Sequence, residues 1–149
     1  MGHELRNVSL IPIDYDFYEK QVAKFDYELF HAAYTEFTFN QYFAFSKVVI
    51  LDGKVVAFYL CRNYYKTVLS IHTLAVKTAY QGRGIGSRLI EDVIAEARPR
   101  SIARISLCTQ TDNIIAQDLY KSFGFKKVAR DRELDVYYMS KRIHRRMNV

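Results

Sequence analysis

The residues with the clearest chemistry form a glycine-rich stretch, Gln81-Gly82-Arg83-Gly84-Ile85-Gly86. Glycine tolerates positive φ angles, so the backbone can curl closely around a ligand. A helical periodicity begins within this stretch, and the N–H groups at the start of a helix favour a negative charge. The pattern therefore predicts a pyrophosphate site, to which Arg83 and Arg88 would add charge-assisted contacts.

Closely spaced glycines also occur in three alternative kinds of turn. A structural turn that uses glycine for tight packing stays open as an alternative. The dinucleotide fingerprint GxGxxG would need a third glycine where this chain has Ser87, and it would follow a strand that opens a βαβ unit. A Walker-type loop is excluded, because no GKS or GKT follows the glycines.

A second pattern, N-x-x-A-x-x-LY-x-x-x-GF, lies downstream. Its matching residues are Asn113, Ala116, Leu119, Tyr120, Gly124 and Phe125. The two patterns in this order, with a preceding L-x-V strand and Tyr80, resemble the motifs of GNAT-type N-acetyltransferases. The resemblance covers about Thr67 to Phe125 and departs at Lys77-Thr78, where the family often has a proline. It implies a GNAT α/β (α+β mixed) fold, with a mostly antiparallel sheet of about seven strands flanked by about four helices.

The resemblance also implies a co-substrate and a reaction. Acetyl-coenzyme A would donate its acetyl group to a primary amine of a small molecule, peptide or protein, by direct attack in a ternary complex. The strand at 74–76 would splay from its neighbour, so that the pantetheine arm bonds to it like an added strand, and an N–H near Leu74 would stabilise the oxyanion. The residues expected to bind the cofactor are Leu74, Ala75, Val76, Gln81, Gly82, Arg83, Gly84, Ile85, Gly86, Ser87, Arg88, Asn113 and Tyr120.

Tyr120 falls at the family's general-acid position, where a phenol faces the departing sulfur; the alternative is a core tyrosine on the inner stripe of its helix. A phenol pKa near 10 and a thiol pKa near 8.5 make full proton transfer uphill by about 2 kcal/mol. We therefore expect mainly a strong hydrogen bond to the developing thiolate. Asn113 is expected to cap the same helix, and in the family its side chain also reaches the cofactor arm.

The acceptor amine must lose a proton, and His72 is the candidate base. Its ordinary pKa near 6.5 suits that role. The run His72-Thr73-Leu74-Ala75-Val76 resembles the H-x-L-A-V strand of the arylalkylamine N-acetyltransferase branch. A hydrogen-bonded core histidine is an equal alternative. Acceptor selection is expected from the initial helices and from the loop before the last strand, with Tyr34, Glu36, Phe37, Phe39, Tyr42, Asp131 and Glu133 as candidates.

Hydropathy periodicity predicts the elements that must position these residues. Helices are expected at 18–32, 37–45 and 85–97, and from a cap at Asp112 or Asn113 to Phe123. Asp52-Gly53 predicts a tight hairpin turn. Strands are expected at 8–11, 48–51, 55–61, 67–76, 104–109, 125–129 and 136–140. The chain shows neither a repeat nor a Pro/Gly/Ser linker, so we expect one domain over residues 1–149.

Composition narrows the class of protein. The net charge of +6 favours anionic partners such as coenzyme A. Cys61 and Cys108 lie in strand-like runs without metal-ligand spacing, which predicts reduced core residues and no metal. Without a signal-like or membrane-length apolar run, we expect a cytoplasmic protein that does not bind membranes.

Two other functions stay open beside the enzyme. One is an acyl-CoA sensor of the same fold that does not transfer the acetyl group. The other is an RNA-binding module that uses the basic run Lys141–Arg146, although a solvated terminus explains that run better and nucleic acid is not an expected partner. The family resemblance also allows a homodimer.

Overall fold

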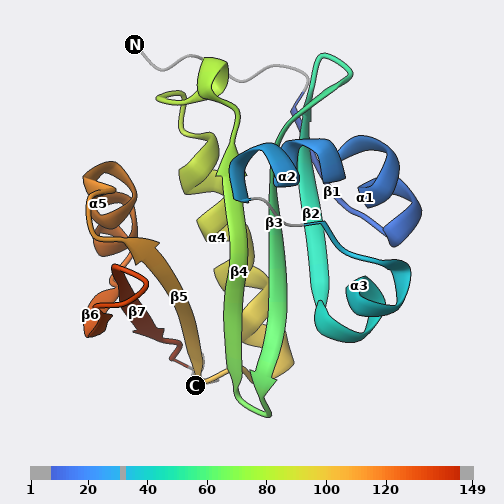
Figure 1. Cartoon of the computed structure of the whole chain (residues 1–149). Helices are drawn as coiled ribbons and strands as arrows, with labels where there is room; N and C mark the ends of the chain where they lie inside the picture. The colour runs from blue at the N-terminus through green and yellow to red at the C-terminus, as the bar shows by residue number, and fades with distance from the viewer. Residues whose placement is uncertain (1–7, 31–32, 145–149) are drawn as a thin grey trace, which may run out of the picture. The chain divides into compact units, whose positions relative to one another are not determined.

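The computed structural model describes residues 8–30 and 33–144. Its strands form one sheet in the order β1-β2-β3-β4-β5-β7-β6 (Figure 1). The strands are β1 (Val8–Pro12), β2 (Phe45–Leu51), β3 (Lys54–Tyr65), β4 (Val68–Val76), β5 (Arg104–Gln110), β6 (Lys126–Asp131) and β7 (Val136–Arg142). The helices are α1 (Tyr15–Gln21), α2 (Ala23–Phe30), α3 (Glu36–Tyr42), α4 (Ile85–Ala97) and α5 (Ile114–Ser122), with short 3-10 helices η1 (Thr78–Tyr80) and η2 (Arg98–Arg100). The predicted mixed, mostly antiparallel fold is confirmed.

The chain groups into two compact units. The first contains the described residues up to 62 and those at 73–86, and the second contains 63–72 and the described residues from 87 onward. The prediction of a single domain over 1–149 stays a prediction.

The first unit has a core built largely from aromatic rings. Tyr18, Phe25 and Phe39 from the three N-terminal helices, with Phe43 just after α3, pack with apolar residues of β2 and β3, among them Phe58. The rings of Tyr18 and Phe39 lie 4.9 Å apart, and those of Phe25 and Phe58 meet edge to face at 5.1 Å. Such contacts follow from the high aromatic content of the chain.

The predicted helix at 18–32 is two helices, α1 and α2, which meet at Val22; its last two predicted positions lie outside the described residues. The φ of Val22 is −123°, outside the helical range. Tyr18 Oη donates to Asp26 Oδ2 at 2.6 Å across this break. Eight residues of straight helix would separate the two by about 12 Å, so the break lets them meet. Periodicity alone did not reveal it, because the apolar spacing of Tyr18, Val22 and Phe25 continues across the break.

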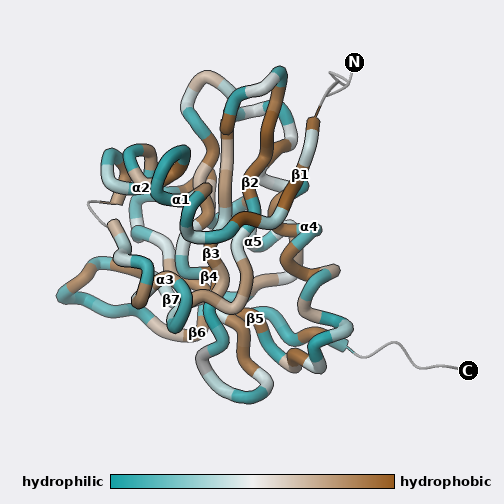
Figure 2. Tube along the Cα trace, turned by 90° about the vertical axis from the view of Figure 1, so that its right-hand side faces the viewer, coloured by the Kyte–Doolittle hydropathy of each residue, from teal (hydrophilic) through white to brown (hydrophobic). Residues whose placement is uncertain are grey.

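The predicted hairpin between β2 and β3 is confirmed. Asp52 and Gly53 have φ values of 50° and 78°, as a tight two-residue turn requires. A β-bulge between Val49 and Ile50 shifts the register of the pair. Along α4, hydrophilic and hydrophobic segments alternate, as expected for an amphipathic helix (Figure 2).

The second unit contains β5, β6, β7 and α5. β5 pairs antiparallel with β7 over its whole length, and β7 pairs with β6. The parallel ladder between β4 and β5 holds three residue pairs and ends at Ser70–Ser106. Gly124 follows α5 with a φ of 90°, which confirms it as the glycine that ends the helix.

Two expectations need correction or restriction. Cys61 is buried, but Cys108 is exposed and is not a core residue, because it lies on the outward-facing side of β5. The basic run at 141–146 is not a free terminus over its first part, since Lys141 and Arg142 end β7; Arg145 and Arg146 lie outside the described residues. No helix in the described part of the chain combines the length and the apolar character that crossing a membrane requires.

Candidate active site

The strand that leads into the glycine turn has two distinct faces. Ile71, Thr73 and Ala75 of β4 are buried, whereas Leu74 and Val76 are half-buried. Gln81 Nε2 donates to the carbonyl oxygen of Val76 at 3.0 Å, which ties the turn back to the end of the strand. This side chain therefore has a structural role in shaping the turn.

The glycines of the turn are needed for their backbone conformation. Gly82 and Gly84 have φ values of 78° and 82°, where other residues are strained. A Cβ at either position would meet no heavy atom within 4 Å. The alternative of glycines used for tight packing is therefore wrong at these two positions, since the space beside them is open.

The helix that follows begins directly after the second of these glycines. The N–H groups of Ile85, Gly86 and Ser87 belong to the first turn of α4 and have no intrahelical acceptor. Within the described residues, no other protein acceptor is found for them. The first turn also contains no acidic residue, so the positive end of the helix dipole is not neutralised there.

The two arginines beside the turn differ in their surroundings. The Arg83 guanidinium lies over the Tyr80 ring, 5.3 Å from its centroid, so the aromatic residue of the motif positions this cation. Arg88 is exposed on the first turns of α4. The arrangement can accommodate a diphosphate through backbone amides, with cations at its side.

A second group of candidate residues lies on α5. Asn113 caps the helix, because its Oδ1 accepts from the N–H of Ala116 at 3.1 Å. Gln117, which the sequence did not single out, is buried, and its Nε2 donates to the carbonyl oxygens of Gln110 and Thr111, each at 3.0 Å. Gln117 thus fixes α5 to the end of β5. In the sequence, this glutamine cannot be distinguished from a solvent-exposed polar residue of an amphipathic helix, so its contacts could not be predicted.

Tyr120 lies at the inner side of α5 and is 8% exposed. Its ring is 5.9 Å from that of Phe125, and its carbonyl oxygen accepts from the N–H groups of Phe123 and Phe125. Burial, and to a lesser extent the nearby Cys108 thiol, raises the pKa of Tyr120 to about 12. The phenol therefore keeps its proton throughout the neutral range.

His72 is exposed on β4, between the buried side chains of Ile71 and Thr73. The alternative of a core histidine is therefore wrong. The side chain lies on the strand face opposite to the one that enters the core, as period-two alternation requires.

The residues expected to select the acceptor differ in their exposure, and some of them have structural roles. Phe39 is a core residue and does not line a surface, whereas Phe37 is 75% exposed. Tyr34 and Tyr42 are half-buried and meet the Phe43 ring edge to face. In the second unit, Asp131 Oδ1 accepts from the N–H groups of Glu133 and Leu134, so this carboxylate shapes the β6–β7 turn.

Both the sequence and the fold are similar to those of known proteins. A stretch of 58 residues, 39% of this chain, is 45% identical to the N-alpha-acetyltransferase RimI of Mycobacterium tuberculosis and covers 35% of it. The [ribosomal protein bS18]-alanine N-acetyltransferase of Haemophilus ducreyi is 31% identical over 77 residues, 52% of each protein. The chain therefore matches only about a third to a half of the length of these relatives.

Among solved structures, Arabidopsis thaliana Naa50 in complex with the bisubstrate analogue CoA-Ac-MVNAL superposes with a TM-score of 0.76 at 26% identity, over 90% of this chain and 97% of that one. The sequence pattern of the acetyltransferase (GNAT) family matches residues 8–125. This stretch contains both the glycine turn and the α5 motif. Since it is more than half of the chain, the chain belongs to the GNAT acetyltransferase family.

Proposed function

We propose that this protein transfers an acetyl group from acetyl-coenzyme A to a primary amine. The observation that carries the proposal is the junction between β4 and α4, where Gly82 and Gly84 adopt positive φ angles and the first amides of the helix have no protein acceptor among the described residues. Family membership supports the same reading, because acetyl-CoA carries the diphosphate that such a junction recognises.

The remaining cofactor contacts are assigned by the motif. The amides of Gly82 to Ser87 would bind the diphosphate, with Arg83 and Arg88 beside it. The pantetheine arm would bond to the backbone of Leu74, Ala75 and Val76; in support, the β4–β5 ladder ends at Ser70, well before β4 itself ends. The Asn113 side chain already caps α5, so its expected second contact with the cofactor would have to share Oδ1 or use the amide nitrogen.

Two side chains are assigned to proton movements. The amine nitrogen attacks the thioester carbonyl carbon, the carbon–sulfur bond breaks, and coenzyme A leaves as a thiolate. His72, which is exposed on β4, would take the proton from the attacking amine. Tyr120 would donate a hydrogen bond to the leaving sulfur, and its raised pKa keeps it in the form that can donate.

For the acceptor, we propose the α-amine of a peptide or protein. The support is that RimI is named an N-alpha-acetyltransferase and that the analogue bound to Naa50 carries a peptide. The test is release of free thiol from acetyl-CoA with N-terminal peptide libraries, with small arylalkylamines and polyamines as the comparison. Turnover of small amines alone would contradict the peptide assignment but not the enzyme.

The same assay separates the enzyme from an acyl-CoA sensor. A sensor would bind acetyl-CoA in calorimetry but release no thiol with any amine. Mass spectrometry must then show a gain of one acetyl group on the peptide α-amine. Thiol release without acetylated product would indicate hydrolysis and would contradict the transfer reaction.

A further inference from the structure

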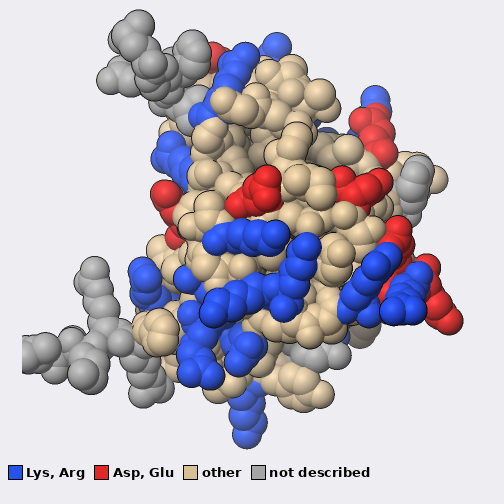
Figure 3. Space-filling view, turned by 90° about the vertical axis from the view of Figure 1, so that its left-hand side faces the viewer, with Lys and Arg blue, Asp and Glu red and all other residues tan. Residues whose placement is uncertain are grey.

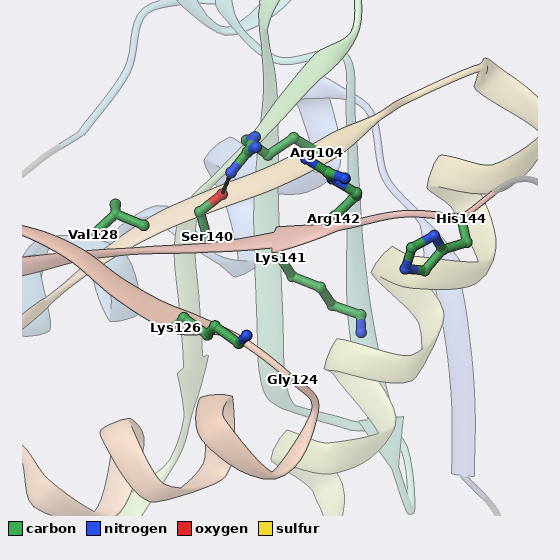
Figure 4. A pocket seen from close by; sticks show the side chains of 8 residues that line it. All are labelled: Arg104, Gly124, Lys126, Val128, Ser140, Lys141, Arg142 and His144. Carbon is green, nitrogen blue, oxygen red and sulfur yellow. Dashed lines mark hydrogen bonds between the residues drawn. The ribbon is translucent and has the colours of Figure 1, made fainter.

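A basic pocket of about 430 Å³ lies in the second unit, where β5 begins and β7 ends (Figure 4). Its lining residues are Arg104, Gly124, Lys126, Val128, Ser140, Lys141, Arg142 and His144. Four of them are cations and none is acidic. None belongs to the residues assigned above to acetyl-CoA or to proton transfer.

Two arginines face each other directly across the pocket's strands. Arg104 of β5 is the register partner of Arg142 of β7, so both side chains project from the same face. Like charges directly opposite one another destabilise a sheet. Arg104 Nη1 donates to Ser140 Oγ at 2.9 Å, which holds one guanidinium in place (Figure 4).

Lys141 approaches the pocket from the side of Gly124. Lys141 alternates to the other side of β7 and points toward Gly124 (Figure 4). A Cβ at Gly124 would lie 3.0 Å from Lys141 Nζ, so the ammonium group lies directly beside this glycine. This position, just beyond α5, also lets Lys141 stabilise the negative end of the helix dipole. Lys126 is exposed and starts β6 as the register partner of Ser140.

The cations of this pocket have no carboxylate partners among the residues that the structure describes. Within the described part of the chain, Arg104, Lys126, Lys141 and Arg142 form no ion pair. Lys and Arg side chains also gather on the face that shows α5, β6 and β7, with few acidic side chains between them (Figure 3). An anionic ligand bound here would therefore lower the repulsion between these cations.

We propose that this pocket binds a small ligand that carries phosphate groups, at a site separate from the glycine turn. Arginine forks and lysine ammonium groups are the side chains that bind phosphate oxygens most strongly. The volume of about 430 Å³ lies in the range of small-molecule sites and fits a nucleotide-sized or polyphosphate ligand. Arg104 and Arg142 are neighbours, so one phosphate-bearing ligand can contact both and lower their mutual repulsion; isolated surface cations gain no such stabilisation.

The test is a titration of the full chain with inorganic tripolyphosphate. Binding is monitored through the backbone amide NMR signals of Gly124 and Ser140. We expect saturable shifts of these two signals. The double variant Lys126→Gln/Arg142→Gln should weaken this binding about tenfold or more. The double variant Lys121→Gln/Arg132→Gln is the matched control, since it removes one exposed lysine and one exposed arginine of the same unit outside the pocket, and it should stay within about twofold of the wild type.

Several outcomes would overturn the proposal. Equal weakening in both double variants would show that only the overall charge attracts the anion. Unshifted Gly124 and Ser140 signals at millimolar tripolyphosphate would show that the pocket does not bind phosphate. A short oligouridine that binds through Lys126 and Arg142 while tripolyphosphate does not would replace the small-ligand site with an RNA-binding surface. Melting temperatures of both variants confirm that each is folded.

Discussion

Tyr120 is a weak acid whose side chain is almost completely buried. Its pKa of about 12 exceeds that of an ordinary thiol by about 3.5 units, so full transfer of its proton to a thiolate would be uphill by about 5 kcal/mol. That is more than double the cost expected for unperturbed groups. The phenol is therefore suited to donating a hydrogen bond that strengthens as charge develops on sulfur, and the proton that finally neutralises the thiolate comes from solvent.

Tyr120→Phe should lower kcat about tenfold or more, with the KM for acetyl-CoA little changed, because the lost hydrogen bond forms mainly in the transition state. The wild-type rate should also show no loss up to about pH 10.5 from ionisation of this phenol, whereas an ordinary phenol with a pKa of 10 would be mostly ionised there. Steady-state kinetics with both substrates check both points. A turnover within a factor of two of the wild type would contradict the role.

Asp26 is the second residue whose surroundings change its chemistry. It is fully buried, Oδ2 accepts from Tyr18, and Oδ1 has no partner among the described atoms. Burial raises the pKa of this carboxyl above its ordinary 3.8, and the Tyr18 hydrogen bond offsets this only in part. The folded state thus holds this proton more tightly than the unfolded state does.

The contribution of Asp26 to stability should therefore be complete below about pH 3.8 and lost as the pH rises through the raised pKa. Asp26→Asn cannot ionise, so its free energy of unfolding relative to the wild type should increase between pH 4 and pH 7. Urea unfolding of both proteins across this range is the measurement. A constant difference would mean that the carboxyl is not desolvated in the folded protein.

At the scale of elements, the turn between β4 and α4 depends on the backbone of two glycines. Gly84→Ala places a Cβ at a φ of 82°, which should cost about 1–2 kcal/mol of stability and move the turn amides. The KM for acetyl-CoA should therefore rise severalfold.

Gly53→Ala is the matched control. Gly53 has a φ of 78°, also with no heavy atom within 4 Å of the added Cβ, but it lies in the β2–β3 hairpin. Its melting temperature should fall by a similar amount while the KM stays the same. If both variants raise the KM equally, the effect comes from lost stability, and the role of the turn is contradicted.

The sequence predicted most elements because their signals are local. The Asp52-Gly53 turn, the Asn113 cap and the Gly124 helix end each depend on the preferences of one or two residues. The break at Val22 brings together two residues eight positions apart, and no local preference encodes their hydrogen bond.

The site residues divide in the same way. The motifs marked the glycine turn and Tyr120, but not the side-chain contacts of Gln117 or the exposure of Cys108, which depend on how α5 and β5 pack. The opposition of Arg104 and Arg142 required the register of β5 and β7, because the two lie far apart in the chain. Strand register is set by pairing and cannot be read from either strand alone.

For the whole molecule, the net charge of +6 should help to attract coenzyme A, which carries several negative charges. The KM for acetyl-CoA should rise severalfold between about 50 mM and about 500 mM NaCl, because salt screens this attraction. The neutral donor S-acetyl-N-acetylcysteamine, which lacks the diphosphate, should show no such rise. An equal effect of salt on both donors would mean that salt acts on the chemical step or on the acceptor.

The exposure and charge of β6 bear on self-association. β6 is the last strand of the described sheet order, so one of its edges offers backbone groups to any strand that approaches. Lys126, Lys127 and Arg130 make up half of its six residues. Two copies that paired along this edge would bring like charges together, and fibril growth by strand addition is discouraged for the same reason. We expect any homodimer of this protein to use another surface. Replacing these three cations with neutral residues would turn the edge of β6 into a template for aggregation.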